Sequence, residues 1–214
     1  MIPQLKYGAS NLLLSALTNL ALGHEKLGKR DEAIETVLPA SELAAGILFN
    51  LAFLHFRAKR YEAALHFAQA SYLLRPNNED IVHQYGAVLS ELGRLKEAVK
   101  LLKLATELES GCAGAWYDLG LAHARLKHRT QARRCLLKSL ELRPESAWSH
   151  YDLACLDALE GRRDAAFDNL LEAVERGFRD LGHIRRDADL RSLRRDARWK
   201  TLIKQIGDLA YANN

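Results

Sequence analysis

The 214-residue chain has 48% hydrophobic and 27% charged residues, which supplies a large core and excludes a disordered chain. Only four prolines and 7% aromatic residues accompany abundant Ala, Leu, Glu, Arg and Lys, so helices are favoured over strands. Three cysteines without C-x-x-C spacing argue against a disulfide framework or a zinc cluster, and they favour a reducing, cytoplasmic location.

Residues 1–13 form an N-terminal segment ahead of the regular part of the chain. The apolar stretch that begins here is interrupted by Asn11, Ser15 and Thr18. It is therefore a poor signal peptide and too polar to cross a bilayer, and we expect no membrane span. Its apolar side chains leave self-assembly open, with this segment meeting another copy of the chain in a homo-oligomer.

A period of 34 residues organises the chain from residue 14 to residue 180. Gly86 and Ala98, for example, recur at this offset as Gly120 and Ala132. Each repeat has an apolar stripe at i, i+3, i+4 and i+7, a Gly or polar turn and a second stripe, which predicts two antiparallel helices. The first offset is 31, so three residues are missing around Ala40 to Gly46. The predicted repeats span 14–44, 45–78, 79–112, 113–146 and 147–180.

The clearest repeat, 113–146, shows which known family the period resembles. It carries Trp116, Leu119, Gly120 and His123, followed by Ala132, Leu136, Ser139 and Pro144. These residues resemble the tetratricopeptide repeat, whose pattern is W-x-x-L-G-x-x-Y with a later small residue and a closing Pro. The resemblance implies an all-α, right-handed α-solenoid of about five helix pairs, with an inner face that binds other proteins.

Residues 181–214 are predicted to close this array with capping helices, because a solenoid needs a polar end. The sequence from His183 to Trp199 resembles the closing module of many bacterial tetratricopeptide arrays, with Ala188 and Ala197 replacing the module's two prolines. Asp187 and Asp196 are expected to N-cap two short helices. Six apolar residues are expected to pack on the fifth repeat: Leu190, Leu193, Trp199, Leu202, Ile203 and Ile206.

The capping segment also concentrates positive charge. Its arginines are Arg185, Arg186, Arg191, Arg194, Arg195 and Arg198. We interpret them as the solvated side of the cap. A nucleic-acid surface and a docking site for an acidic protein are the alternatives. Interspersed Asp residues count against nucleic acid, which normally requires a clustered patch of one sign.

A second apolar line on the first helix of each repeat predicts the binding groove. Its members are Phe49, Phe53, Phe56, His83, Tyr117, Leu121 and Tyr151, and beside them run Asn50, Gln84, Asp118 and Asp152. Such a trough suits a peptide or helix with apolar anchors and an Arg or Lys near the two carboxylates. The alternative is that the phenylalanines pack against the N-terminal segment or neighbouring repeats.

No motif for catalysis is present: the chain has no Gly-rich phosphate loop, no H-E-x-x-H and no nucleophile elbow. One repeat position is occupied by His24, His55 and His123. Neighbouring repeats lie about 10 Å apart, so these side chains are too far from one another to bind the same metal ion. We therefore expect no cofactor, no metal and no enzymatic activity. The sequence predicts a scaffold or adaptor that binds another protein, with nucleic-acid association through the cap and self-assembly as alternatives.

Overall fold

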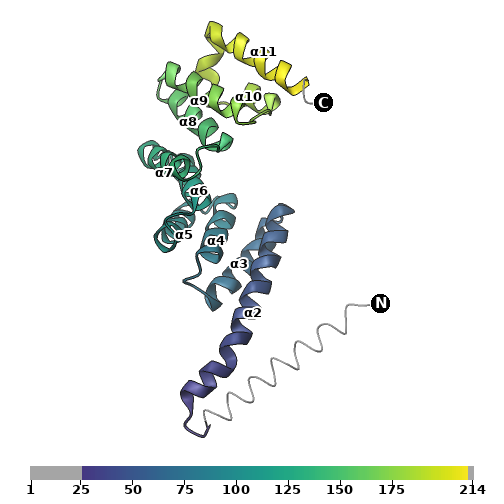
Figure 1. Ribbon diagram of the computed structural model, residues 1–214, viewed down its shortest axis with the longest axis vertical. Coiled ribbons are helices and arrows are strands. Elements are labelled where there is room, and N and C mark those ends of the chain that lie inside the picture. Colours follow the sequence, from purple (N-terminus) through teal and green to yellow (C-terminus); the bar gives the residue numbers. More distant parts are fainter. Residues whose placement is uncertain (1–25, 212–214) are drawn as a thin grey trace, which may run out of the picture. The chain divides into compact units, whose positions relative to one another are not determined.

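The computed structural model describes residues 26–211, and every element in that range is a helix (Figure 1). The chain divides into two compact units, residues 1–92 and 93–214. In its described part, the N-terminal unit contains α2 (Arg30–Arg57), α3 (Tyr61–Leu74) and α4 (Glu79–Glu91). The C-terminal unit contains α5 (Leu95–Leu108), α6 (Ala113–Arg125), α7 (Arg129–Leu142), α8 (Ala147–Leu159), α9 (Arg163–Glu175), α10 (Leu181–Arg186), the 3₁₀ helix η1 (Arg191–Arg195) and α11 (Ala197–Tyr211).

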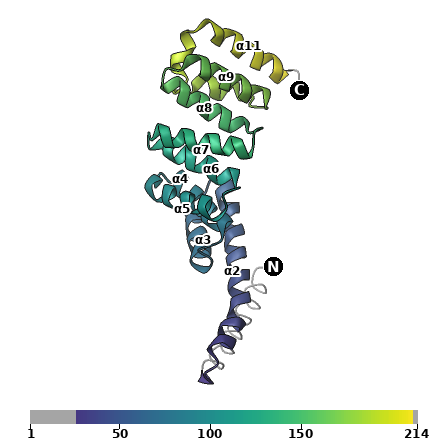
Figure 2. The same cartoon turned by 60° about the vertical axis from the view of Figure 1, so that its left-hand side comes forward.

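The helices confirm the 34-residue period and the all-α solenoid. The first helices α4, α6 and α8 begin at residues 79, 113 and 147, and the second helices α5, α7 and α9 begin at 95, 129 and 163. Within the C-terminal unit, α6 pairs with α7, α8 pairs with α9, and the two pairs stack through α7 and α8 (Figure 2). The fold therefore arises by repetition of one helical hairpin.

Gly120 allows α6 and α7 to approach closely. A Cβ atom at this position would lie 3.0 Å from the Leu136 side chain and 3.3 Å from the Ala132 carbonyl oxygen. A larger residue at position 120 would therefore push these two helices apart.

The turn inside each hairpin requires a left-handed residue. Gly93 and Gly161 both have φ of +76° there, while Lys59 and Lys127 occupy the equivalent places with φ of 57° and 62°. A lysine in this conformation is strained relative to glycine. The backbone bonds of the turn hold it, including one from the Lys127 N–H to the Ala124 carbonyl at 2.8 Å.

The N-terminal unit departs from the predicted repeat boundary at 44/45. Helix α2 runs without a break from Arg30 to Arg57 and includes Pro39. The three residues missing between the first two repeats remove the turn that separates helices elsewhere, so the chain continues as one helix. The N-terminal segment 1–13 and the first helix expected from residue 14 lie outside the described residues, apart from the end of that helix.

Part of α2 also bears on the expectation that the chain has no membrane span. The 20 residues Leu38–Arg57 are long and apolar enough to cross a bilayer, and only 11% of the tested stretch is buried. Leu43 and Leu54 are each 62% exposed. Length and composition alone do not separate such a helix from a core helix of a soluble protein, so that expectation stays unconfirmed.

The capping helices pack as predicted. Leu190, Leu193 and Ile206 are fully buried in one cluster with residues of α8 and α9, and Trp199 and Leu202 join them. Asp196 directly precedes α11, and its carboxylate accepts a hydrogen bond from the Arg198 backbone N–H at 3.0 Å, as expected of an N-cap.

The corresponding prediction for Asp187 is wrong. This residue ends α10 and is not an N-cap of η1, which begins four residues later without a side-chain cap. Its carboxylate instead accepts hydrogen bonds from the Tyr151 hydroxyl at 2.5 Å and the Asp189 backbone N–H at 2.9 Å.

Candidate functional site

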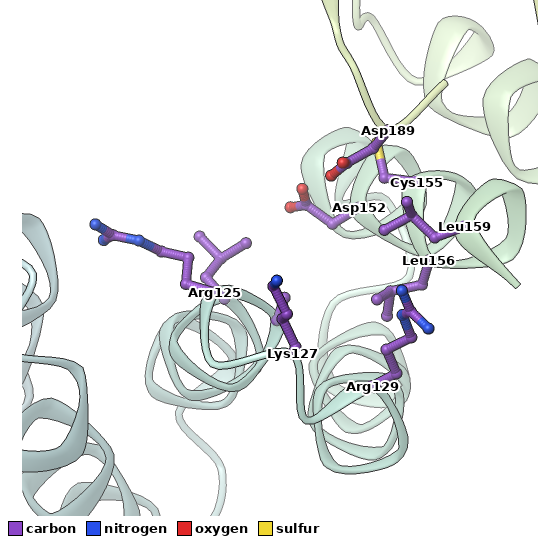
Figure 3. Close-up of a pocket in the computed structure, with 10 residues that line it drawn as sticks. Arg125, Lys127, Arg129, Asp152, Cys155, Leu156, Leu159 and Asp189 are labelled. Atoms are coloured by element: carbon purple, nitrogen blue, oxygen red, sulfur yellow. The ribbon is translucent and has the colours of Figure 1, made fainter. Parts of the chain in front are cut away.

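A cavity of about 510 Å³ lies in the C-terminal unit between α6, α8 and the loop that follows α10 (Figure 3). Its lining residues are Leu121, Ala124, Arg125, Lys127, Arg129, Asp152, Cys155, Leu156, Leu159 and Asp189. Two of the predicted groove residues, Leu121 and Asp152, therefore meet at one site. These two residues lie close together because each is on the first helix of its repeat, at a position predicted to face the groove.

Asp152 is the most unusual side chain of this cavity. Its Oδ2 atom is buried and has no hydrogen-bond partner among the described residues. Burial raises the pKa of the Asp152 carboxyl to about 7, although a hydrogen bond with Tyr117 opposes the shift. The same surroundings, above all burial, raise the pKa of the Tyr117 phenol.

Two further carboxylates from the loop after α10 approach Asp152. The charges of Asp187 and Asp189 both raise its pKa further, and the pKa of Asp189 is itself raised, mainly by burial. Figure 3 shows the carboxylates of Asp152 and Asp189 pointing toward the same region. Sequence reasoning missed both loop residues because the loop lies outside the repeat, where periodicity assigns no facing position.

Cations form the opposite side of the cavity. Lys127 belongs to the turn between α6 and α7, and Arg129 is the first residue of α7. Lys127 extends its ammonium group toward the cavity, while Arg125 extends away (Figure 3). Neither Lys127 nor Arg129 forms an ion pair with Asp152 or Asp189 in the described part of the chain. The cavity thus presents an acidic wall and a basic rim, with leucines between them.

The N-terminal unit has a related feature at the equivalent repeat position. Gln84, which lies two periods before Asp152, donates a hydrogen bond from Nε2 to the Phe49 carbonyl at 3.2 Å. Its Oε1 atom is buried and, like Asp152 Oδ2, has no partner among the described residues. Asn50, one period earlier, is exposed on α2.

The predicted line of phenylalanines is only partly open. Phe53 is 45% exposed, and the Arg57 guanidinium lies 5.7 Å from its ring centre. Phe49 and Phe56 are half-buried, and the ring of Phe56 packs edge-on against Tyr61 at 5.6 Å. Phe53 is therefore the phenylalanine of this line best placed to meet a partner.

Comparison with known proteins now assigns the repeats. The family model of the tetratricopeptide repeat matches residues 80–112 and again residues 113–146. MamA from Desulfovibrio magneticus has a similar structure, with a TM-score of 0.58, 21% sequence identity, and coverage of 76% of this chain and 93% of that one. Residues 80–146 are two tetratricopeptide repeats. YrrB, described as a tetratricopeptide repeat protein with an unusual peptide-binding site, is also similar, with a TM-score of 0.56, 20% identity and coverage of 75% and 84%.

A human protein shares part of this sequence. The O-mannosyl-transferase TMTC1 of Homo sapiens is 29% identical over 132 residues, which cover 61% of this chain. The match spans only 15% of the human protein. The similarity between this chain and the human transferase is therefore limited to a small part of the transferase.

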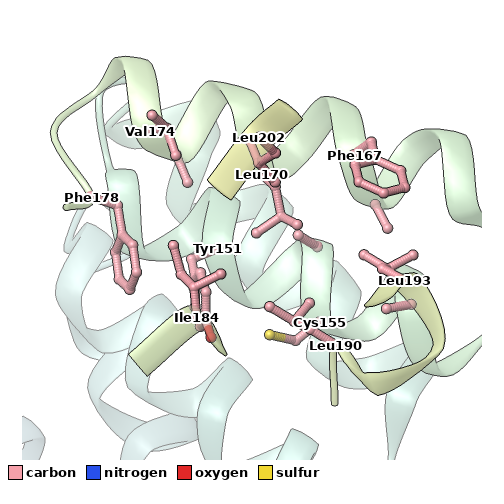
Figure 4. Packing of buried hydrophobic residues seen from close by; sticks show 14 of the residues in the cluster. Tyr151, Cys155, Phe167, Leu170, Val174, Phe178, Ile184, Leu190, Leu193 and Leu202 are labelled. Atoms are coloured by element: carbon pink, nitrogen blue, oxygen red, sulfur yellow. The ribbon is translucent and has the colours of Figure 1, made fainter. Parts of the chain in front are cut away.

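One predicted groove residue of the tetratricopeptide array is not accessible. Tyr151 is 2% exposed because two later residues cover it: the ring of Phe178, in the turn after α9, stacks on it at 4.3 Å (Figure 4), and Asp187 of the cap accepts its hydroxyl hydrogen. The prediction that Tyr151 lines an open groove is wrong. His83 and Asp118 are half-buried on α4 and α6. Among the described residues, no cluster of His, Cys, Asp or Glu is suitably arranged to hold a metal.

The arginines of the cap divide into two groups. Arg198 pairs with Asp196 and Asp164 at 2.8 Å and lies 4.3 Å above the Phe167 ring, and Arg194 donates to the Asp187 carbonyl at 2.6 Å. Both contacts hold the cap together, and the charge of Arg198 is already paired with two carboxylates. The exposed arginines of the cap that have no ion pair in the described range are Arg185, Arg186, Arg191, Arg194 and Arg195. Their binding to an acidic partner or nucleic acid stays a prediction.

Replacing Asp152 by asparagine is expected to stabilise the C-terminal unit more at pH 8 than at pH 5. The folded state holds the Asp152 proton more tightly than the unfolded state, so wild-type stability falls as pH rises toward about 7. Asparagine has no charge to bury, and the advantage of the variant should grow by about 2 to 3 kcal/mol across this range. Urea unfolding at both pH values measures it; an unchanged difference would contradict the burial of this carboxyl.

Proposed function

We propose that this chain is a non-catalytic scaffold that binds a peptide or helical segment of another protein along the first helices of its repeats. One observation carries the proposal. The buried side-chain atoms that lack a hydrogen-bond partner in residues 26–211 are Gln84 Oε1 and Asp152 Oδ2, two acceptors at one repeat position. An unsatisfied buried acceptor costs about 1 to 3 kcal/mol, which a bound segment that donates hydrogen bonds would recover.

The surroundings of the two acceptors support this interpretation. Phe53 offers an exposed aromatic ring on α2 in the N-terminal unit, and the cavity beside Asp152 is lined by leucines. Apolar anchors beside a few fixed polar groups are the usual composition of peptide-binding surfaces. The peptide-binding site of YrrB, a protein of the same fold, is consistent with such a use of the repeat.

Selection of peptides from a random displayed library on the purified chain tests the proposal. Phe53→Ala is expected to weaken selected peptides about tenfold, the usual loss for an aromatic anchor. Leu73→Ala is the matched control, because Leu73 is 72% exposed on α3, a second helix. The folded state should be almost unaffected by either change, which circular dichroism melting checks. Failure to select any peptide, or equal weakening by both variants, would count against groove binding.

A further inference from the structure

We infer that the cavity between α6 and α8 receives one basic side chain, Lys or Arg, of the bound segment, with Asp152 as its counter-charge. The inference rests on the proposed function and specifies the chemistry of the partner at this site. It goes beyond an apolar groove because it assigns a charged residue to a defined place in the ligand.

The acidic wall of the cavity is formed by Asp152 and Asp189. Asp152 has a buried oxygen without a partner, and neither Asp152 nor Asp189 has an ion pair in the described range. The charges of Asp187 and Asp189 raise the pKa of the Asp152 carboxyl, whereas Arg129 acts on Asp189. A buried carboxylate with like charges beside it is unfavourable unless a cation offsets them. An ammonium or guanidinium group supplies both the missing hydrogen bond and the missing charge.

The cavity also has an apolar lining. Leu121, Leu156 and Leu159 surround the approach to Asp152, with Ala124 beside them. Lys and Arg have three or four methylene groups below the charge, and these stems pack well on leucine surface. A small inorganic cation would leave this apolar surface without a partner.

The basic rim limits which segments fit. The positive charges of Lys127 and Arg129 would repel a polybasic peptide at the entrance. An acidic residue near the inserted Lys or Arg would face these two charges favourably. The expected ligand is therefore a segment of balanced charge with one basic residue next to an acidic one.

The titration of the Asp152 carboxyl should make the affinity for the basic residue depend on pH. The groups that face Asp152 are Tyr117 on α6, Cys155 on α8, Asp187 and Asp189 in the loop, and Lys127 and Arg129 at the rim. Because the Asp152 carboxyl has a pKa of about 7, a basic side chain should bind about tenfold more tightly at pH 8 than at pH 6, where the carboxyl is mostly protonated.

Parallel library selections on the wild-type chain and on Asp152→Asn test the inference. Peptides selected on the wild type should share one Lys or Arg with an acidic neighbour, and the variant should not select that position. In a selected peptide, exchange of the basic residue for norleucine should weaken wild-type binding about tenfold or more, and should have little effect on Asp152→Asn. Asp168→Asn, an equal change of charge on the exposed side of α9, is the control and should bind as the wild type does.

The possible outcomes separate this inference from the proposed function. Peptides that depend on Phe53 but share no basic position would overturn the basic pocket and leave groove binding intact. Equal affinity of the lysine and norleucine peptides, or loss of the pH dependence, would also overturn it. A library that yields no binder contradicts the proposed function, and this inference falls with it. Because Asp152→Asn is expected to be at least as stable as the wild type at pH 8, lost binding there would not reflect unfolding.

Discussion

Replacing Asp157 by alanine is expected to lower the free energy of unfolding of the C-terminal unit by about 2 to 4 kcal/mol. Asp157 is 1% exposed, and its carboxylate accepts hydrogen bonds from Arg133 at 2.7 Å, Arg162 at 2.8 Å and Asn169 at 2.9 Å. Alanine leaves these donors around a buried gap. The loss stays below that of a fully buried pair because the two arginine side chains are 26% and 46% exposed and regain water.

Urea unfolding followed by tryptophan fluorescence measures this loss, since Trp116, Trp148 and Trp199 all belong to the C-terminal unit. Asp157→Asn keeps one acceptor oxygen and should lose about half as much as alanine. Asp168→Ala, on an exposed part of α9, should change stability by less than about 0.5 kcal/mol. If alanine at both positions had the same effect, the carboxylate of Asp157 would not be a structural centre.

The position of Asp157 shows what the repeat pattern predicts and what it does not. Asp157 lies 34 residues after His123, at the repeat position where the family's pattern has Tyr, and its side chain is buried. At the same position His55 stacks on Phe67 at 5.3 Å, as a substitute for the aromatic ring. The carboxylate's partners come from α7, α9 and the turn between α8 and α9, and such convergence depends on packing that a single sequence does not reveal.

The residues of the candidate site could also be predicted only in part. Periodicity correctly placed Leu121 and Asp152 on facing first helices, because both lie within the repeat. It misplaced Tyr151, which obeys the same period, because the last repeat has the cap as its neighbour where earlier repeats have another repeat. Asp189 was not foreseen, since a loop residue has no periodic position from which its direction follows.

The second large effect on stability comes from Phe178, in the turn that joins α9 to the cap. Phe178 is 4% exposed, stacks on Tyr151 with ring centres 4.3 Å apart, and receives the edge of Trp148 at 4.7 Å. Phe178→Ala is expected to destabilise the C-terminal unit by about 3 to 5 kcal/mol, because it removes a large buried ring and leaves a cavity. Phe178→Leu fills most of that space and should cost about 1 to 2 kcal/mol.

This prediction links the stability of the cap to the candidate site. With the Phe178 ring gone, Tyr151 loses the surface that fixes its hydroxyl on Asp187, and the loop that carries Asp189 loses a support. Phe178→Ala should therefore also lower the pKa of Asp152, since the loop carboxylates and the burial that raise it are weakened. Carboxyl NMR titration of the folded variant at low temperature measures that shift. An unchanged Asp152 pKa alongside the lost stability would mean that the loop after α10 is held without Phe178, and that the cavity and the cap are independent.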